Sequence, residues 1–323
     1  MTWMVTGGAG YIGAHVVREM TAAGESVVVY DDLSSGSADR LPGDVPLVVG
    51  SVLDRGRLDA AISDHRVSGV VHVAAKKQVA ESVEKPLLYY RENVQGLQTL
   101  LEACAAAGVA RFVFSSSAAV YGMPDVDLVT EDTPCAPVNP YGETKLAGEW
   151  LVRAAGRAHG IGTVCLRYFN VAGTAAPELA DTGTTNLVPA VLRRLAAGEA
   201  PVIFGDDYPT PDGTCVRDYI HVSDIASAHL AAAGRLVRTG AQTDLVLNIG
   251  RGEGVSVREM TELVSEVTGG TGPAAVVAPR RAGDPARVVA SAALIGRELG
   301  WSARHGVKEM AESAWEAMSR RRA

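Results

Sequence analysis

The segment MVTGGAGYIGAH, residues 4–15, restricts the possible folds more than any other part of the sequence. It spaces Gly7, Gly10 and Gly13 three residues apart, after a short apolar run and before an amphipathic stretch. Glycines at a strand-to-helix turn let the backbone pass close to a diphosphate, and the first N–H groups of the helix are free to bind an anion. Such turns also occur for packing alone, so the segment indicates a dinucleotide site only together with its surroundings.

The second apolar run supplies those surroundings. It reads SVVVY over residues 26–30 and ends at Asp31, 18 residues beyond Gly13. A carboxylate at this place hydrogen-bonds the adenosine ribose diol and repels a 2′-phosphate. Asp32 adds a second negative charge. The two features together predict a dinucleotide site that prefers NAD to NADP.

The rest of the first half alternates short apolar runs with longer helical patterns. Strands are expected at 3–5, 26–30, 47–49, 69–73, 112–115 and 162–167, and helices at 14–23, 57–65, 88–107 and 144–159. Valine- and isoleucine-rich runs alternating with helices are typical of a parallel sheet covered on both faces. The fold class expected is therefore α/β: a Rossmann-type, doubly wound parallel sheet with a smaller α/β substrate-binding lobe. We expect an NAD-binding domain at 1–167, with a returning segment near 215–237, and a lobe that occupies mainly 168–323.

Composition excludes several other classes of protein. The net charge of −7 argues against nucleic acid as the main partner. The four cysteines are widely separated and the seven histidines form no metal-binding motif, so we expect no metal site and structural roles for His221 and His229. Neither a signal peptide nor an apolar run of membrane-spanning length is evident. A soluble, cytoplasmic protein without a membrane partner is expected.

A candidate catalytic set lies in the middle of the chain. The segment NPYGETKLAGEW, residues 139–150, has a proline suited to a helix start and places Tyr141 and Lys145 one helical turn apart. Ser117 ends the serine run of FVFSSSAAVYG at 112–122. Taken alone, the tyrosine and the lysine also suit an ordinary amphipathic helix, and serine clusters often only satisfy turns. Downstream of a dinucleotide turn, the three residues together favour a catalytic site.

These three residues are similar to the Ser-Tyr-Lys set of the short-chain dehydrogenase/reductase superfamily, and the glycine spacing resembles its extended branch. Four longer segments narrow the resemblance to the UDP-glucose 4-epimerase family. They are VVHVAAKKQVAESVEKPLLYYRENVQG at 70–96, RYFNVAG at 167–173, FGDDYPTPDGTCVRDYIHVSDIASAHL at 204–230 and RRAGDPA at 280–286. The resemblance runs from about residue 2 to residue 301.

The resemblance implies site residues position by position. The residues implied at the NAD site are Gly7, Gly10, Tyr11, Ile12, Gly13, Asp31, Asp32, Leu33, Ser34, Ser35, Gly36, Ser51, Val52, Val73, Ala74, Ala75, Lys77, Asn93, Ser115, Tyr141, Lys145, Tyr168 and Phe169. Those implied at the UDP-sugar site are Ser117, Asn170, Asn186, Leu187, Phe204, Arg217, Arg281, Asp284 and Val288. Three positions depart from the family pattern: Ser51 replaces an aspartate that contacts adenine, Asp32 an asparagine, and Ala119 a threonine.

The family's activity gives the catalytic residues their expected roles. Tyr141, with its pKa lowered by Lys145 and by the nicotinamide cation, would take the proton of the sugar 4-hydroxyl, and Ser117 would hold the same oxygen. Val288 stands where a tyrosine often closes the hexose pocket, so the N-acetylated UDP-sugars are expected as additional substrates. A homodimer formed by the helices at 88–107 and 144–159 is also implied.

Other activities on the same fold stay open. UDP-glucuronate and UDP-pentose 4-epimerases share the motifs, and a non-catalytic NAD-binding regulator shares the fold but usually lacks the tyrosine or the lysine. A 4,6-dehydratase carries Asp-Glu just after the serine, where this chain has Ala118 and Ala119. The dehydratase is therefore disfavoured.

Overall fold

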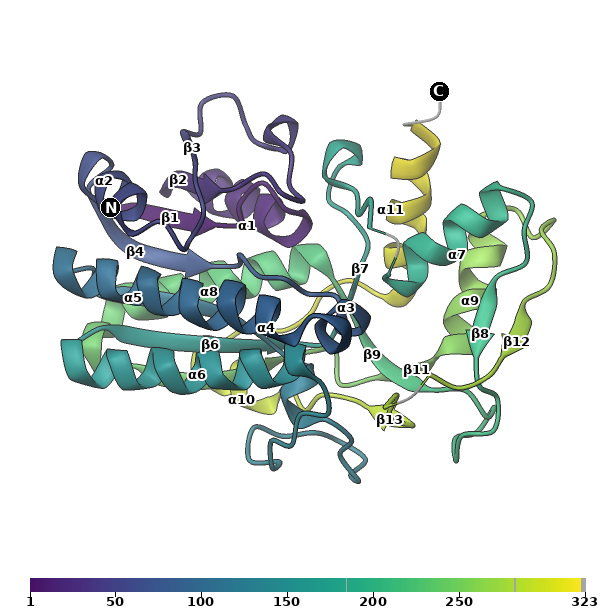
Figure 1. Ribbon diagram of the computed structural model, residues 1–323. Coiled ribbons are helices and arrows are strands. Elements are labelled where there is room, and N and C mark those ends of the chain that lie inside the picture. Colours follow the sequence, from purple (N-terminus) through teal and green to yellow (C-terminus); the bar gives the residue numbers. More distant parts are fainter. Residues whose placement is uncertain (184, 282, 321–323) are drawn as a thin grey trace.

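A twisted parallel sheet organises the larger part of the molecule (Figure 1). The computed structural model describes residues 1–183, 185–281 and 283–320. Within them the sheet has the strand order β10-β6-β5-β4-β1-β2-β3, with every neighbouring pair parallel. Its strands are β1 (Thr2–Thr6), β2 (Ser26–Asp31), β3 (Leu47–Val49), β4 (Val67–His72), β5 (Arg111–Ser117), β6 (Gly162–Tyr168) and β10 (Asp244–Ile249). The strand order reverses between β1 and β4, where ligands of such sheets bind beyond the carboxyl ends of the strands.

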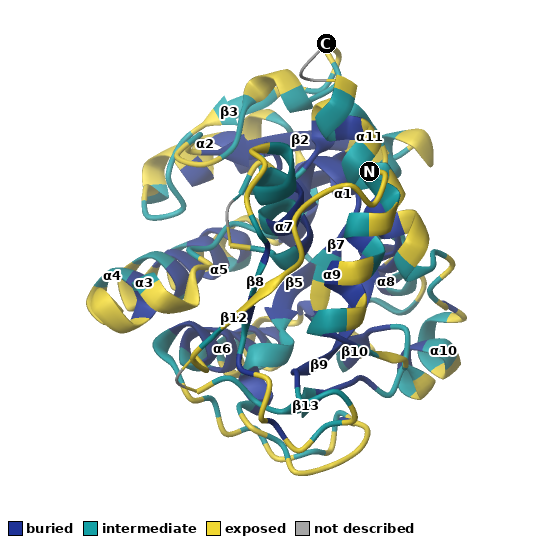
Figure 2. Cartoon of the chain, turned by 90° about the vertical axis from the view of Figure 1, so that its right-hand side faces the viewer, coloured by how far each residue is buried: buried dark blue, intermediate teal, exposed yellow. Residues whose placement is uncertain are grey.

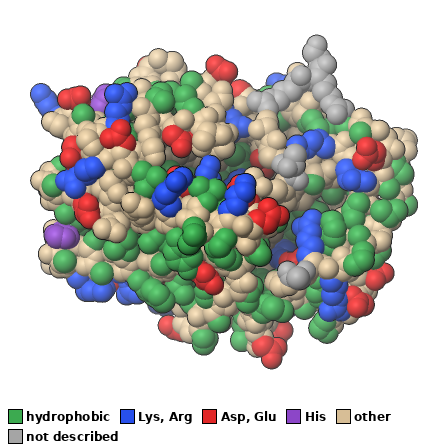
Figure 3. All heavy atoms as spheres, viewed as in Figure 1, with side chains coloured by type: hydrophobic (Ala, Val, Ile, Leu, Met, Phe, Trp, Pro, Cys, Tyr) green, Lys and Arg blue, Asp and Glu red, His purple; other side chains and the backbone are tan. Residues whose placement is uncertain are grey.

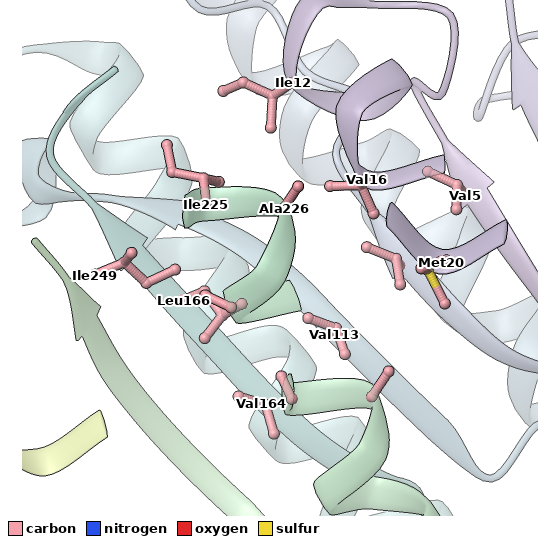
Figure 4. Packing of buried hydrophobic residues seen from close by; sticks show 14 of the residues in the cluster. Val5, Ile12, Val16, Met20, Val113, Val164, Leu166, Ile225, Ala226 and Ile249 are labelled. Atoms are coloured by element: carbon pink, nitrogen blue, oxygen red, sulfur yellow. The ribbon is translucent and has the colours of Figure 1, made fainter. Parts of the chain in front are cut away.

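The strands are mostly apolar in their middle parts because both faces of the sheet are covered. Val27 and Val29 of β2 pack into one buried cluster and Val28 into the other, as the two-residue period of a strand requires. The first cluster lies against α1 (Tyr11–Ala22) and α8 (Val222–Thr239) and includes Met20 and Ile225 (Figure 4). The second lies against α2 (Arg55–Asp64), α5 (Gly96–Ala107) and α6 (Pro140–His159). Each fully buried aliphatic side chain contributes roughly 1.5–3 kcal/mol.

The helix expected at 88–107 is interrupted. It consists of α4 (Pro86–Tyr89), a π-helical turn over Tyr90–Gln95 and then α5, and it follows the short helix α3 (Val79–Glu84). The π turn contains Asn93, which is buried and bonds to the Lys76 backbone and to the Thr144 side chain. A local propensity does not encode these contacts, which explains why the sequence predicted an uninterrupted helix.

A smaller lobe occupies one end of the molecule, at the right of Figure 1, and faces the viewer in Figure 2. In it, β9 (Val216–His221) pairs with β7 (Asn170–Ala172), β11 (Gly254–Ser256) and β13 (Arg287–Val288), and β8 (Val202–Phe204) pairs with β12 (Val276–Ala278). Helices α7 (Leu187–Ala196), α9 (Val257–Val267) and α11 (Val307–Arg320) share a buried cluster with Ala172 and Tyr219. After β9 in the smaller lobe, the chain returns to the larger part, where α8 packs on α1 and β10 extends the large sheet. The domain limits expected from the sequence stay a prediction.

The remaining elements are short. They are the 3₁₀ turns at Ala38–Arg40, Ala118–Tyr121, Pro177–Leu179 and Gly240–Gln242, and the helix α10 (Ala293–Leu299). Across the described ranges, no helix combines the length and the apolar character that crossing a bilayer requires.

Candidate active site

The glycine turn lies at the carboxyl end of β1, where the strand order reverses. Gly7 has a positive φ of 70°, and a Cβ there would lie 2.6 Å from the Ala74 nitrogen of the neighbouring strand's loop. A Cβ on Gly13 would lie 2.0 Å from the Gly7 carbonyl oxygen, so only glycine permits this packing. Helix α1 starts at Tyr11 with Gly10 as its N-cap, so no side chain covers its first N–H groups. The turn therefore leaves backbone donors and close-approach space for a diphosphate.

Asp31 closes the next strand and holds the loop that follows. Its carboxylate accepts hydrogen bonds from the Ala9 nitrogen at 2.9 Å and the Leu33 nitrogen at 2.8 Å, and burial raises its pKa. Each carboxylate oxygen keeps a further acceptor position, which suits ribose hydroxyl groups. Leu33 has a positive φ of 57°, and the Asp32 side chain accepts from the Ser34 nitrogen. The expected cofactor loop, residues 31–36, is thus a tight turn beside the glycine turn.

The other residues predicted at the cofactor follow neighbouring strands of the same sheet. Ser51 and Val52 follow β3, and the Ser51 carbonyl accepts a hydrogen bond from the Tyr30 hydroxyl at 2.9 Å. Val73, Ala74 and Ala75 follow β4, where the nitrogens of Val73 and Ala74 bond to the Thr6 carbonyl. Lys77 is exposed, whereas Asn93 is buried. Tyr168 is the last residue of β6, and Phe169 follows it.

The structure brings Ser117, Tyr141 and Lys145 together at the carboxyl end of β5. Asn139 caps α6 by accepting from the Gly142 nitrogen, and Pro140 occupies the first turn, so the helix begins just before Tyr141. Tyr141 is 8% exposed and Lys145 is 3% exposed. The Lys145 ammonium donates to the Ser115 carbonyl oxygen at 2.8 Å and lies 6.0 Å from the centroid of the Tyr141 ring.

Burial is the main influence on the pKa values of Tyr141 and Lys145. Burial raises the pKa of Tyr141, and a hydrogen bond from Ser117 opposes that rise. Burial also lowers the pKa of Lys145 to about 8, while the charge of Glu149 raises it. For the chain's own groups, the cost of burying a phenolate dominates the pKa of Tyr141. The lowering expected from Lys145 together with the nicotinamide cation stays a prediction.

The side chains of Ser115 and Ser116 make different contacts. The side chain of Ser115, predicted at the cofactor, pairs with His229 of α8 at 2.8 Å, and only its carbonyl faces Lys145. Ser116 donates to the Glu149 carboxylate. Glu149 is not among the site residues predicted from the sequence, although its place four residues after Lys145, one helical turn away, is a usable signal. His229 also bonds to the Ile225 carbonyl, and His221 caps α8, so both histidines make structural contacts.

Residues predicted to hold the UDP-sugar belong to the smaller lobe and the loops around it. Arg217 of β9 pairs with Asp284 at 2.7 Å, and the Arg281 guanidinium lies 3.8 Å from the centroid of the Phe204 ring. Asn186 occupies the N-cap position of α7, which starts at Leu187, but its side-chain amide donates to Asp181 at 2.6 Å and does not cap the helix. Asn170 begins β7 and is exposed. Val288 of β13 is 7% exposed and belongs to a buried cluster with Val120 and Phe169.

The sheet is doubly wound and carries the glycine turn, and serine, tyrosine and lysine gather at the carboxyl end of its strand β5. Together these features define an NAD-dependent enzyme of the short-chain dehydrogenase/reductase class. Comparison with known proteins narrows the class. Residues 3–250 match the NAD dependent epimerase/dehydratase family, and the chain belongs to that family.

Its relatives are more specific. The chain is 48% identical over 306 residues to a UDP-glucose 4-epimerase of Azospirillum brasilense, covering 94% of this chain and 87% of the relative. A crystal structure of a UDP-glucose 4-epimerase superposes with a TM-score of 0.94 at 42% identity, covering 100% of this chain and 98% of that one. The Bifidobacterium longum enzyme, crystallised with NAD⁺ and UDP, has a TM-score of 0.92 at 35% identity, covering 99% and 98%. The predicted fold class, the NAD dependence and the resemblance to UDP-glucose 4-epimerases are confirmed.

Proposed function

We propose that this chain interconverts UDP-galactose and UDP-glucose by inverting carbon 4 of the hexose, with NAD as its bound cofactor. The observation that carries the proposal is the placement of Ser117, Tyr141 and Lys145 at the sheet edge that holds the dinucleotide turn. Relatives that match nearly the whole chain are UDP-glucose 4-epimerases, which supports the substrate. The roles of individual residues below are part of the proposal.

The residues at the glycine turn fit NAD. Gly7, Gly10 and Gly13 form a cradle that side chains would fill, and Asp31 supplies acceptors for ribose hydroxyls. The negative charges of Asp31 and Asp32 disfavour a 2′-phosphate. When bound, NAD supplies a reversible hydride acceptor for carbon 4, so that the complete reaction has no net redox change.

Tyr141 moves the proton at the sugar 4-oxygen. Because Lys145 serves as the cation of the predicted catalytic set, the Tyr141 hydroxyl is the group that acts as the base, and Ser117 bonds to it and orients the sugar oxygen. Lys145 stabilises the phenolate by its positive charge, fixed by the Ser115 carbonyl. A positioned acid or base of this kind contributes about 10²–10⁴-fold to the rate.

Inversion requires the nucleotide to stay fixed while the hexose turns. Arg217, Arg281 and Asn186 are placed to hold the diphosphate and nucleoside, because guanidinium groups bind phosphate oxygens with two parallel hydrogen bonds. Asp284 orients Arg217 through their 2.7 Å ion pair. The apolar wall formed by Phe169 and Val288 offers the hexose fewer polar contacts, which suits a sugar that must present both faces.

Purified protein supplied with UDP-galactose tests the proposal, with a UDP-glucose dehydrogenase reporting the product. Mass spectrometry of the denatured protein should also release NAD⁺ or NADH. Stoichiometric dependence on added NADP⁺ would overturn the cofactor assignment. Turnover of a UDP-uronate or UDP-pentose in place of UDP-galactose would select the alternative epimerases, and absence of turnover with NAD still bound would select a regulator.

We also propose a homodimer in the cytoplasm. Val83, Leu87 and Tyr90 project from the α3–α4 region and Trp150 from α6, and Leu87 is 84% and Trp150 64% exposed. Hydrophobic side chains gather on this face (Figure 3). Burying them against a second copy would stabilise an interface, and sedimentation measurements on wild type and Leu87→Glu test it. All four cysteines are free thiols, which suits a reducing compartment.

A further inference from the structure

A buried ion pair lies directly beneath the catalytic lysine. Glu149 follows Lys145 by one turn of α6, and its side chain is 2% exposed. Arg167 of β6, 6% exposed, donates two parallel hydrogen bonds to it, at 2.8 Å from Nε and 2.6 Å from Nη2. The Ser116 hydroxyl, next to Ser117 in the chain, donates to the same carboxylate. Three elements, α6, β5 and β6, therefore fix this carboxylate in place.

The arginine is fixed in turn by a second layer of contacts. Its Nη1 donates to the Tyr121 hydroxyl at 2.8 Å, and its guanidinium lies 4.9 Å from the centroid of the Tyr121 ring. Tyr121 donates to Asn248 of β10 at 2.7 Å. A bidentate pair with satisfied neighbours is rigid, but a buried pair is weak evidence for stability, since apolar residues often serve equally well. Stability therefore does not account for the placement of this ion pair beside Lys145, and a role in the chemistry of the lysine does.

We propose that Glu149 is a positioning residue for the reaction, whose carboxylate keeps the buried Lys145 side chain in its ammonium form beside Tyr141. The inference rests on the proposed function, in which Lys145 must carry a positive charge to stabilise the phenolate. Arg167 and Ser116 serve by holding the carboxylate one helical turn below the lysine.

The surroundings of Lys145 explain why it needs this help. Its ammonium lies against the Phe114 ring, 5.1 Å from the centroid, and makes its hydrogen bond to the neutral Ser115 carbonyl. Burial lowers its pKa to about 8, and the charge of Glu149 opposes that change. Without Glu149, desolvation would favour the neutral amine near neutral pH.

The other titratable groups around Lys145 do not provide the missing charge. Burial lowers the pKa of His72 on β4 to about 3 and of His229 on α8 to about 4, so both are neutral above pH 6. Burial raises the pKa of Tyr168 on β6, which is therefore also neutral, and Arg167 is a cation. On α6 itself, Tyr141 is the group that the ammonium serves. The carboxylate of Glu149 is thus the group that favours the cation.

The test uses three variants of the holoenzyme: Glu149→Gln, Arg167→Gln and the double variant Glu149→Gln/Arg167→Gln. Both single variants break the same ion pair and destabilise the fold, because each leaves a buried partner uncompensated. The negative charge beside Lys145 is removed in Glu149→Gln and in the double variant, but not in Arg167→Gln. The double variant leaves two neutral amides, which restores folding where Glu149→Gln alone proves unstable.

The readout is the pH dependence of kcat for UDP-galactose, with KM measured at each pH. In Glu149→Gln and in the double variant, the alkaline fall of kcat should move to lower pH by about one unit, with KM changed less than twofold. In Arg167→Gln it should stay in place or move to higher pH. An unchanged alkaline limb in the double variant, or equal shifts in both single variants, overturns the inference. Lack of any activity in wild type, or full activity in Tyr141→Phe, overturns the proposed function and this inference with it.

Discussion

The ammonium of Lys145 lies 6.0 Å from the centre of the Tyr141 ring while its hydrogen bond goes to the backbone of Ser115. In the proposed function, the lysine would therefore act on the tyrosine through its charge and not through a hydrogen bond. Burial raises the pKa of the phenol, so the chain alone does not prepare a base for neutral pH. In the proposed function, the positive nicotinamide ring of bound NAD⁺ would add to the charge of Lys145 in stabilising the phenolate.

Tyr141→Phe should abolish epimerisation and leave the fold and the bound NAD intact. The substitution removes the hydroxyl and keeps the ring in its 8% exposed site. We expect kcat to fall by at least about 100-fold, the lower range for loss of a general base. The coupled assay measures kcat and mass spectrometry measures the NAD content. A variant that retains more than about a tenth of wild-type kcat would show that another group is the base.

Gly13→Ala should destroy the cofactor turn. The new Cβ would lie 2.0 Å from the Gly7 carbonyl oxygen and 2.8 Å from the Gly8 Cα, both on the backbone of a tight turn. Relief requires the turn to move, so we expect NAD to be lost and the free energy of unfolding to fall by about 1–3 kcal/mol, as for an overpacked core. Gly43→Ala is the matched control, because a Cβ there meets no atom within 4 Å. Equal NAD content in the two variants would contradict the assigned turn.

Much of the fold could be predicted from the sequence because most strands of the large sheet are specified by short local segments. Each of the six strands expected in the first half forms, with ends displaced by no more than two residues, since its apolar run stands between recognisable turns. The seventh strand, β10, and the pairing of β9 with three other strands depend on contacts between distant segments. The π turn around Asn93 depends on Lys76 and Thr144 in the same way.

The site was predictable in its motifs and less so in its electrostatics. Spacing alone identifies Tyr141 and Lys145 as neighbours, because one helix carries both. It does not show that Arg167, on strand β6, compensates the charge of Glu149 on helix α6. It also does not give the depth of burial, which sets the direction of the Tyr141 pKa change.

His229→Gln should make the protein less sensitive to acid. Burial lowers the pKa of His229 to about 4, so the folded protein holds the neutral ring while the unfolded chain binds a proton below about pH 6.5. A depressed folded-state pKa of a base contributes stability that is complete above pH 6.5 and is lost as the pH falls toward 4. The loss of unfolding free energy between pH 7 and pH 5 should therefore shrink by about 2 kcal/mol in the variant.

Urea titrations at the two pH values measure this difference. His159→Gln is the control, because it makes the same substitution at an exposed histidine at the end of α6. His15, His72 and His221 are also buried, with pKa values lowered to about 4, 3 and 4, so acid sensitivity should diminish in His229→Gln without disappearing. A pH dependence identical to that of wild type would mean that His229 is protonated in the folded protein or that the site opens to water.

The last prediction concerns the sugars that fit. Val288 lies on β13 in a buried cluster with Val120, Phe169 and Ala290. The resemblance to the family predicts that this position borders the hexose and that a tyrosine there would narrow the sugar pocket. The UDP-glucose and UDP-galactose pair accounts for the similarity to known enzymes, and acceptance of the N-acetylated pair is a prediction that follows only from the small side chain. Exclusion of a larger substituent is steric, and a contact of methylene size changes kcat/KM by roughly 10–200-fold.

Wild type should therefore interconvert UDP-N-acetylglucosamine and UDP-N-acetylgalactosamine, and Val288→Tyr should lower kcat/KM for that pair at least about tenfold relative to UDP-galactose. The ratio of the two substrates is the measurement, because a general loss from overpacking the cluster, about 1–3 kcal/mol of stability, would affect both alike. Val288→Leu adds bulk without a ring and should give an intermediate ratio. The prediction is wrong if wild type does not turn over the N-acetylated pair, or if the tyrosine leaves the ratio unchanged.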